Sequence, residues 1–288
     1  MENKGFQNHS LIETPDIIGL YSGPDRIISS TEAREKIASQ PKAELFATGF
    51  RTLDETINGL EAGELISIGG PTKHGKTLLA QTITVNLTDL SVPCLWFTFE
   101  VPVPQFMKQM PEKTVFYLPA ELKIHDIDWI KKRVIESSFK FQTKVIFIDN
   151  LHHLFDISQS RNTSLDIGNL IRQLKRLAIG TETVIFLLCH SRKPSDASGQ
   201  YKEQTEWDLR DSSFIPQESD STWMIQRRMN PKTMEFSDAA NLRVCNHRRT
   251  GAMGRTISLR KRGSILVEEN DNGQHNLGDF KLRAAGDI

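Results

Sequence analysis

Four short apolar runs recur along the middle of the chain, and amphipathic stretches separate them. They are LISIG (65–69), CLWFTF (94–99), KVIFID (144–149) and TVIFLLC (183–189), and they are rich in β-branched and aromatic residues. Continuous apolar runs of this length are typical of strands that are buried on both faces. The stretches between them predict helices that form right-handed crossovers between parallel strands. The pattern therefore predicts an α/β fold with a central, mostly parallel sheet flanked by helices.

The same pattern divides the chain into a polar arm over residues 1–44, a core over residues 45–268 and a polar tail over residues 269–288. Within the arm, STEAREKIASQ predicts a short helix that begins at Ser30 or Thr31 and ends before Pro41. An arm of this size is too small to be a domain, and the tail has the composition of a segment that frays. We therefore expect one α/β domain, formed by the core.

Composition is that of a soluble globular protein and excludes several other classes. Hydrophobic residues make up 38% of the 288 and charged residues 25%, and 36 basic residues balance 36 acidic ones. Zero formal charge means that a polyanionic partner must bind a local basic patch. The three cysteines include no CxxC pair, which argues against a zinc ribbon or disulfides and favours a reducing compartment. The polar start and the lack of ~20 consecutive apolar residues predict a cytoplasmic protein with no membrane partner.

Residues 69–80, GGPTKHGKTLLA, contain the P-loop pattern G-x4-G-K-[ST], from Gly70 to Thr77, between a predicted strand and a predicted helix. Glycines let such a loop wrap with its N–H groups pointing inward, and the helix N-terminus adds positive potential for phosphate. Lys76 is expected to reach the β and γ phosphates and Thr77 to ligate Mg²⁺; a chance glycine-rich turn is the alternative. The predicted nucleotide-binding residues of the loop are Gly70, Pro71, Thr72, Lys73, His74, Gly75, Lys76 and Thr77.

Two carboxylates follow strands at the edge of the sheet where ligands of such folds bind. Asp149 ends KVIFID and is predicted to hold the Mg²⁺ ion through water. Glu100 follows CLWFTF and is predicted to orient and deprotonate the attacking water. A strand-end acid that only faces solvent is the alternative for Glu100. The pattern predicts an enzyme that hydrolyses a nucleoside triphosphate with Mg²⁺, and we take ATP as its substrate.

The order of these motifs resembles the RecA-like motor domain of hexameric replicative DNA helicases, the group of DnaB, Twinkle and the phage primase-helicases. The resemblance covers about residues 45–268, and it implies a RecA-like P-loop NTPase fold. The matching segments are FATGFRTLDETINGLEAGELISIGG, FEVPVPQFMKQM, VIFIDNLHHLF, VIFLLCHSRKP and WDLRDSSFIPQESDSTWMIQRR. The last two of these are the most specific, because many ATPases carry the others.

The resemblance also implies where the γ-phosphate and DNA are sensed. In CHSRKP, His190 takes the position of the family's γ-phosphate sensor, which connects to a DNA-binding loop; a structural histidine is the alternative. The polar loop after it and DLRDSS (208–213) take the positions of two DNA-binding loops, and SQSRNTS (158–164) is a weaker candidate. Solvated surface turns are the alternative for all three. The predicted DNA-binding residues are Arg192, Lys193, Lys202, Arg210, Asp211, Ser212, Ser213 and Arg161.

A basic stretch from Arg227 to Arg262 lies within the otherwise neutral chain. Its segment CNHRRTGAMG resembles the family segment that reaches into a neighbouring subunit and supplies an arginine finger. Arg248 and Arg249 are both eligible for this role, which would make hydrolysis depend on assembly. Arg227, in MIQRR, matches a family position that packs on the nucleotide base. A basic face that contacts DNA or solvent is the alternative for the whole stretch.

These features predict a homo-oligomeric ring, a hexamer by resemblance, that translocates on single-stranded DNA and unwinds duplex during replication. The resemblance adds primase or other replisome proteins as partners, in the cytoplasm of a bacterial or phage-infected cell. Family members carry a further domain before the motor, so the short arm predicts either a minimal motor or a fragment. Two alternatives stay open. A RecA-type recombinase or recombination mediator would form filaments on single-stranded DNA, and a KaiC-like regulatory ATPase would need little DNA binding.

Overall fold

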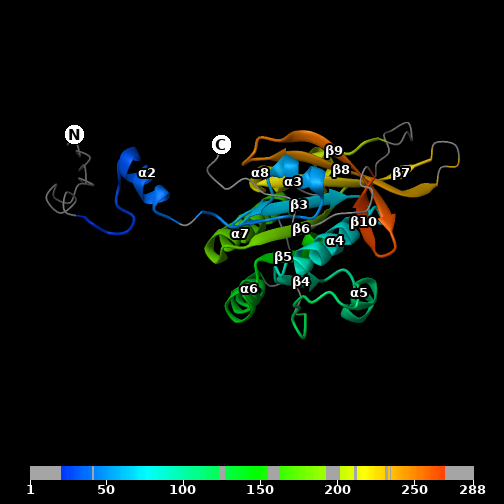
Figure 1. Ribbon diagram of the computed structural model, residues 1–288, viewed down its shortest axis with the longest axis horizontal. Coiled ribbons are helices and arrows are strands. Elements are labelled where there is room, and N and C mark those ends of the chain that lie inside the picture. The colour runs from blue at the N-terminus through cyan, green and yellow to red at the C-terminus, as the bar shows by residue number, and fades with distance from the viewer. Residues whose placement is uncertain are drawn as a thin grey trace, which may run out of the picture. The chain divides into compact units, whose positions relative to one another are not determined.

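The computed structural model describes residues 21–40, 42–122, 127–154, 163–192, 202–210, 213–230, 233 and 235–269 (Figure 1). Contacts divide the chain into two parts, with the boundary between Lys42 and Ala43. In the first part, helix α2 (Ser30–Ala38) begins at one of the two residues expected and buries no side chain. The Ser29 hydroxyl accepts a hydrogen bond from the Glu32 N–H, so Ser29 is the N-cap residue.

The second part is built on a mixed sheet. Its strands are β3 (Leu65–Gly70), β4 (Cys94–Thr98), β5 (Val145–Asp149), β6 (Val184–His190), β7 (Ser221–Met229), β8 (Phe236–His247), β9 (Met253–Arg262) and β10 (Ile265–Glu268). They lie in the order β10-β9-β8-β7-β3-β6-β5-β4 (Figure 1). The strands from β7 to β4 pair in parallel, whereas β8, β9 and β10 extend the sheet by antiparallel pairing. The expected α/β fold is confirmed, and the antiparallel extension adds to it.

Helices pack on both faces of this sheet. The described α-helices of this part are α3 (Arg51–Ile57), α4 (Lys76–Asp89), α5 (Val103–Gln109), α6 (Ile127–Phe141), α7 (Thr163–Thr181) and α8 (Phe214–Glu218). A separate pair of short strands, β1 (Leu45–Phe46) and β2 (Leu60–Glu61), flanks α3 in the chain.

Within the described residues, no helix has both the length and the apolar composition of a membrane span.

The two faces of the sheet contribute to two hydrophobic cores, because successive strand residues point to opposite faces. In β6, Phe186 and Leu188 lie in one core with residues of α3, α4 and α5. Ile185 and Leu187 of the same strand lie in the other core with residues of α6, α7 and α8. Both faces are covered, which explains why the central strands are continuous apolar runs rather than alternating ones.

Helix α4 is packed on two sides, whereas helix α7 buries a single apolar stripe. Helix α4 packs on the sheet through residues such as Leu79, and it also contacts β10, where the Leu266 N–H donates to the Thr82 hydroxyl at 3.0 Å. Helix α7 carries one apolar stripe, with Ile171 and Leu174 buried against the opposite face. The helix that follows the P-loop is thus held from two sides.

The ends of the strands define two edges of the sheet. At the carboxyl edge, β3 ends in the P-loop, and Gly70 lies beside His190 of β6. At the amino edge lies the turn from β8 to β9, because His247 at the end of β8 pairs with Ser221 at the start of β7. Residues that the sequence analysis singled out lie at both edges.

Candidate nucleotide site and basic surfaces

The loop from β3 to α4 takes a conformation that two of its glycines make possible. Gly70 has φ +153° and Gly75 has φ +103°, and Gly75 is the N-cap residue of α4. A Cβ on Gly70 would lie 2.4 Å from the Ile225 carbonyl oxygen of β7, so only glycine fits there. The loop therefore lies close against β7 and presents the first turn of α4 at the carboxyl edge.

Lys76 is buried at the start of α4, with its ammonium group against the loop. Its Nζ donates hydrogen bonds to the carbonyl oxygens of Gly70 at 2.9 Å and Pro71 at 3.0 Å. Burial lowers the pKa of this ammonium, and the charges of Glu100 and Asp149 oppose that effect. Among the described residues, no carboxylate forms a direct ion pair with it. A buried cation in this state gains from binding phosphate oxygens.

Thr77 and Asp149 meet beside this lysine, although 72 positions separate them in the chain. The Thr77 hydroxyl donates to Asp149 Oδ2 at 2.7 Å, and Asp149 Oδ1 is buried with no hydrogen-bond partner in the described part of the chain. Burial raises the pKa of Asp149 to about 6, and the charge of Glu100 adds to the effect. A hydroxyl, a carboxylate oxygen without a partner and incoming phosphate oxygens are hard oxygen donors, so these residues fit Mg²⁺.

Asn150 joins Glu100 to His190 at the same edge. Its Nδ2 donates to Glu100 Oε2 and lies 2.9 Å from His190 Nε2. Burial, with the Lys76 charge in support, lowers the pKa of His190 to about 4, so the ring is neutral at pH 7 and we assign Nε2 as an acceptor. Sequence reasoning singled out Glu100 and His190 but missed Asn150. The signal that could have found it is its position directly after Asp149.

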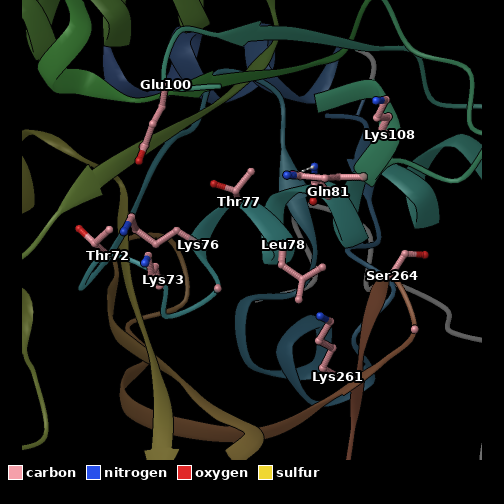
Figure 2. Close-up of a pocket in the computed structure, with 13 residues that line it drawn as sticks. Thr72, Lys73, Lys76, Thr77, Leu78, Gln81, Glu100, Lys108, Lys261 and Ser264 are labelled. Carbon is pink, nitrogen blue, oxygen red and sulfur yellow. Dashed lines mark hydrogen bonds between the residues drawn. The ribbon is translucent and has the colours of Figure 1, made fainter. Parts of the chain in front are cut away.

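A pocket of about 510 Å³ opens between the P-loop, α5 and the turn from β9 to β10. Figure 2 shows Glu100 pointing into it toward Lys76 and Thr77, with Lys261 on another side. Lys108 of α5 also lines the pocket. Sequence reasoning counted Lys261 only in the basic stretch and did not name Lys108, because α5 and β9 meet the P-loop only in the folded chain.

A smaller hollow of about 150 Å³ adjoins this pocket and shares Lys261 and part of the P-loop with it. Arg227 lines it, and its backbone N–H donates to His74 Nδ1 at 3.1 Å. The Arg227 guanidinium donates to the carbonyl oxygens of Ser237 and Phe236 at 2.9 Å and 3.1 Å. The structure thus places Arg227 next to the P-loop, with its side chain fixed against β8.

A third hollow, of about 560 Å³, lies beyond the end of β6 and is lined in part by Arg192, Arg210 and Ser213. Both arginines are exposed, and the Arg210 N–H donates to the His190 carbonyl oxygen at 3.0 Å. The structure therefore brings together three of the predicted DNA-binding residues, whereas Lys202 is not part of this lining. The other four, Lys193, Asp211, Ser212 and Arg161, lie outside the described residues.

Arg248 and Arg249 lie at the amino edge, in the turn after β8. Arg248 is exposed, and its guanidinium donates to the Gln217 carbonyl oxygen. Arg249 is bound within the chain, because its Nε donates to Glu64 Oε1 at 3.0 Å and lies 3.0 Å from Glu61 Oε2. The structure distinguishes two residues that sequence reasoning treated alike, and neither lines the pocket at the P-loop of its own chain.

A P-loop at the carboxyl edge of a parallel sheet, with carboxylates after the neighbouring strands, defines a RecA-like P-loop nucleotide-binding protein. The chain belongs to the DnaB-like helicase C-terminal domain family, whose model matches residues 46–115 and 109–265. The resemblance seen in the motifs is thereby confirmed.

Curated relatives of the chain are replicative helicases. It is 24% identical over 290 residues to the replicative DNA helicase DnaB of Haemophilus influenzae, a match that covers 86% of this chain and 61% of that protein. It is 26% identical over 246 residues to the replicative DNA helicase DnaB of Buchnera aphidicola subsp. Schizaphis graminum, covering 74% of this chain and 52% of the relative. The chain therefore spans less than two thirds of the length of these relatives.

Solved structures share the fold. One is described as a DnaB-like replicative helicase with its interactions with primase, and it matches at a TM-score of 0.68 and 18% identity, covering 82% of this chain and 66% of that one. A second, described as an ATPase domain, matches at a TM-score of 0.67 and 18% identity, covering 82% of this chain and 95% of that one. This chain thus has the fold of a helicase ATPase domain.

Proposed function

We propose that this chain is the motor of a DNA helicase, which couples ATP hydrolysis to movement along single-stranded DNA and to unwinding of duplex during replication. The observation that carries the proposal is a connection across the end of β6. His190 contacts Asn150, which binds Glu100, and the His190 carbonyl accepts from Arg210 in the third hollow. A change at the γ-phosphate would therefore reach Arg210 in the third hollow through the end of β6. The family, whose curated relatives are named as replicative DNA helicases, supports this proposal.

The pocket at the P-loop supplies the groups that ATP hydrolysis requires. Lys76 would bind β- and γ-phosphate oxygens, and Thr77 and Asp149 would hold Mg²⁺, which adds positive charge beside those oxygens. Glu100 is the proposed general base. Asn150 binds its Oε2 and so leaves Oε1 to take a proton from water.

The remaining loop residues would bind the triphosphate through their backbone N–H groups, because the loop precedes the positive end of α4. We assign the base to the smaller hollow beside Arg227, whose apolar lining includes Leu78 and Ile225. The fixed guanidinium offers a flat cationic face to an aromatic base.

The position of Arg248 and Arg249 requires a second copy of the chain if either residue acts on ATP. β3 has six residues, or about 20 Å at roughly 3.3 Å each, and it separates the P-loop from the amino edge. A guanidinium at the amino edge is therefore placed to serve a neighbour's phosphate. Arg248 is exposed, so a neighbouring subunit can approach it, whereas Arg249 would first have to break its ion pairs with Glu61 and Glu64. We infer a homo-oligomeric ring, and the family resemblance implies a hexamer.

We assign the motor to residues 45–268, with a linker arm over 1–44 and a polar tail over 269–288. The proposed ligands are ATP, Mg²⁺, single-stranded DNA and further copies of the chain. Primase is a proposed partner, because a solved helicase of the same fold is described with primase. The family relatives favour action in the cytoplasm of a bacterial or phage-infected cell.

The test is ATP hydrolysis measured with and without single-stranded DNA over a range of protein concentrations, together with strand separation of a forked duplex. We expect DNA to stimulate hydrolysis, and the specific rate to rise with protein concentration as rings form. His190→Ala should reduce the stimulation more than it reduces ATP binding, since linkage between two bound ligands is reciprocal. His153→Ala, in the short helix η1 (Leu151–Leu154), is the matched control. A full rate that depends on neither DNA nor protein concentration would contradict the proposal.

A further inference from the structure

Trp207 differs from the other tryptophans of the chain in its exposure. Trp96 and Trp223 are fully buried, and Trp129 packs partly buried against Phe97, with ring centroids 5.8 Å apart. Trp207, in contrast, is 64% exposed. A single exposed hydrophobic residue is ordinary on a protein surface, so its surroundings decide whether it has a role.

Trp207 lines the hollow of about 560 Å³ beyond β6, together with Arg192 and Arg210. Within the described part of the chain, neither guanidinium is paired with a carboxylate, although Glu206 also lines the hollow. An aromatic ring beside two cations that no described carboxylate pairs with matches the chemistry of single-stranded nucleic acid, which offers base faces for stacking and phosphates for the guanidinium groups. The serines of the lining add further hydrogen-bonding groups.

The backbone that carries Trp207 is held by hydrogen bonds. The indole projects from the short helix η3 (Glu206–Asp208), where Asp208 Oδ2 accepts from the Thr205 N–H at 2.9 Å in a capping box. The Asp208 carbonyl oxygen accepts from the Arg192 N–H at 2.8 Å, which ties η3 to the chain just after β6. The next residue, Leu209, is buried. A ring on a fixed backbone loses little conformational entropy when a base stacks on it.

We propose that Trp207 is a stacking platform for a base of single-stranded DNA, with the Arg192 and Arg210 guanidinium groups binding the adjoining phosphates. This inference rests on the proposed helicase function and adds a contact to the bases themselves. Asp208 of η3 bonds to Arg192, two residues after the strand end at His190, so the stacked base would move with that strand end. Stacking tolerates every base, which suits a protein that must move along any sequence.

The experiment measures binding of a labelled oligothymidylate and of an abasic oligonucleotide of the same length, with a non-hydrolysable ATP analogue present. Trp207→Ala should weaken oligothymidylate binding by about 5- to 150-fold, the range for loss of one stacked base, and leave abasic binding unchanged. Trp207→Phe should keep most of the affinity. Phe139→Ala removes another exposed aromatic side chain, 85% exposed and outside the hollow, and should change neither affinity. Thermal unfolding of each variant verifies the fold.

The outcomes separate the two proposals. If the wild-type chain binds neither oligonucleotide, the helicase proposal itself is wrong. If the wild type binds both but Trp207→Ala binds oligothymidylate normally, the helicase proposal stands and the stacking proposal is wrong. An equal loss on the two oligonucleotides would also overturn stacking, because the indole would then support the phosphate contacts alone. Quenching of tryptophan emission by oligothymidylate that disappears in Trp207→Phe would support it.

Discussion

The two edges of the central sheet carry the same kinds of charged side chain in opposite states. At the carboxyl edge, Lys76 binds only carbonyl oxygens among the described residues, and Asp149 Oδ1 is buried without a partner. At the amino edge, Lys175 donates to Asp220 Oδ2 at 2.7 Å, and Arg249 is paired with Glu64. Within the described part of the chain, Lys76 and Asp149 at the first edge lack ion-pair partners, whereas the charges named at the second edge are paired with each other.

This difference separates groups that we propose bind a ligand from groups that hold the fold. At the carboxyl edge, burial lowers the pKa of Lys76 and raises that of Asp149 to about 6, so the charged form of each is disfavoured until a ligand compensates it. At the amino edge, burial alone would raise the pKa of Glu64, yet His247 and Arg249 hold it below its usual range. In this chain, a buried charged side chain without an ion-pair partner at the end of a strand therefore marks the candidate site better than the presence of a charged side chain alone.

The largest expected effect comes from replacing one lysine at each edge of the sheet. Lys76→Met should abolish ATP hydrolysis and leave thermal stability nearly unchanged, because it removes a buried cation that has no ion-pair partner among the described residues. Lys175→Met should lower the free energy of unfolding by about 1–3 kcal/mol and leave hydrolysis per folded molecule intact, because Asp220 loses its partner. Denaturant unfolding and steady-state ATPase assays measure both. Wild-type turnover by Lys76→Met would refute the site.

The second prediction concerns the two arginines of the amino edge. Arg248→Ala should bind ATP but lose hydrolysis by on the order of 10³–10⁵-fold, the effect of an arginine finger. Arg249→Ala should instead keep hydrolysis per folded molecule and lose about 2 kcal/mol of stability, because Glu64 is left buried without this partner. Mixing Arg248→Ala with Lys76→Met protein should restore part of the activity, at interfaces where an intact P-loop meets an intact Arg248. Failure of complementation across all mixing ratios would argue against action between subunits.

The third prediction tests the general base. Glu100→Gln should keep nucleotide affinity and lose turnover by on the order of 10²–10⁴-fold, because the amide cannot take a proton from water. Glu61→Gln at the amino edge is the control and should leave turnover per folded molecule unchanged. Binding of a fluorescent ATP analogue and single-turnover hydrolysis distinguish the two steps. Collapse of affinity with an unchanged rate per bound ATP would make Glu100 a binding residue instead.

The smallest expected effect is a pH dependence. Since the pKa of Asp149 is raised to about 6 from its usual 3.8, its carboxyl is protonated below that pH in the ligand-free chain. The Mg²⁺ contribution to nucleotide binding should be present above pH 6 and fall by up to about tenfold per unit below it. Between pH 3.8 and 6 the native state binds a proton at this carboxyl that the unfolded state has lost. The contribution of Asp149 to the free energy of unfolding therefore decreases as pH rises through that window.

The check is binding of a non-hydrolysable analogue with and without Mg²⁺ as a function of pH. Protonation of the nucleotide phosphates is common to all variants, so Asp149→Asn isolates the protein's own contribution. The Mg²⁺ effect should be small and independent of pH in that variant. A wild-type profile with the same midpoint as Asp149→Asn would assign the titration to the nucleotide.

The parts of the site that the sequence predicted are short motifs and strand ends, and the parts that it missed depend on register. The spacing of Gly70, Gly75 and Lys76 lies within one short segment, which predicted the loop. Asp149 and Glu100 could be named because each lies at or directly after the carboxyl end of a predicted strand. The role of Asn150 depends on β5 lying beside β6, which brings His190 within 2.9 Å. The difference between Arg248 and Arg249 depends on which of them faces Glu64. Lys261 enters the pocket only through the antiparallel strands, whose pairing partners no local pattern specified.

The last described strand has a consequence for the order in which the chain acquires its structure. Glu268 of β10 accepts hydrogen bonds from the Thr52 N–H and hydroxyl, both at 2.9 Å across 216 positions, and Leu266 bonds to Thr82 of the P-loop helix. Contacts of such sequence separation form slowly. During synthesis, the P-loop helix emerges long before the strand that covers it. We therefore expect a nascent chain to acquire tight ATP binding only after β10 has left the ribosome, so nucleotide affinity would report completion of folding.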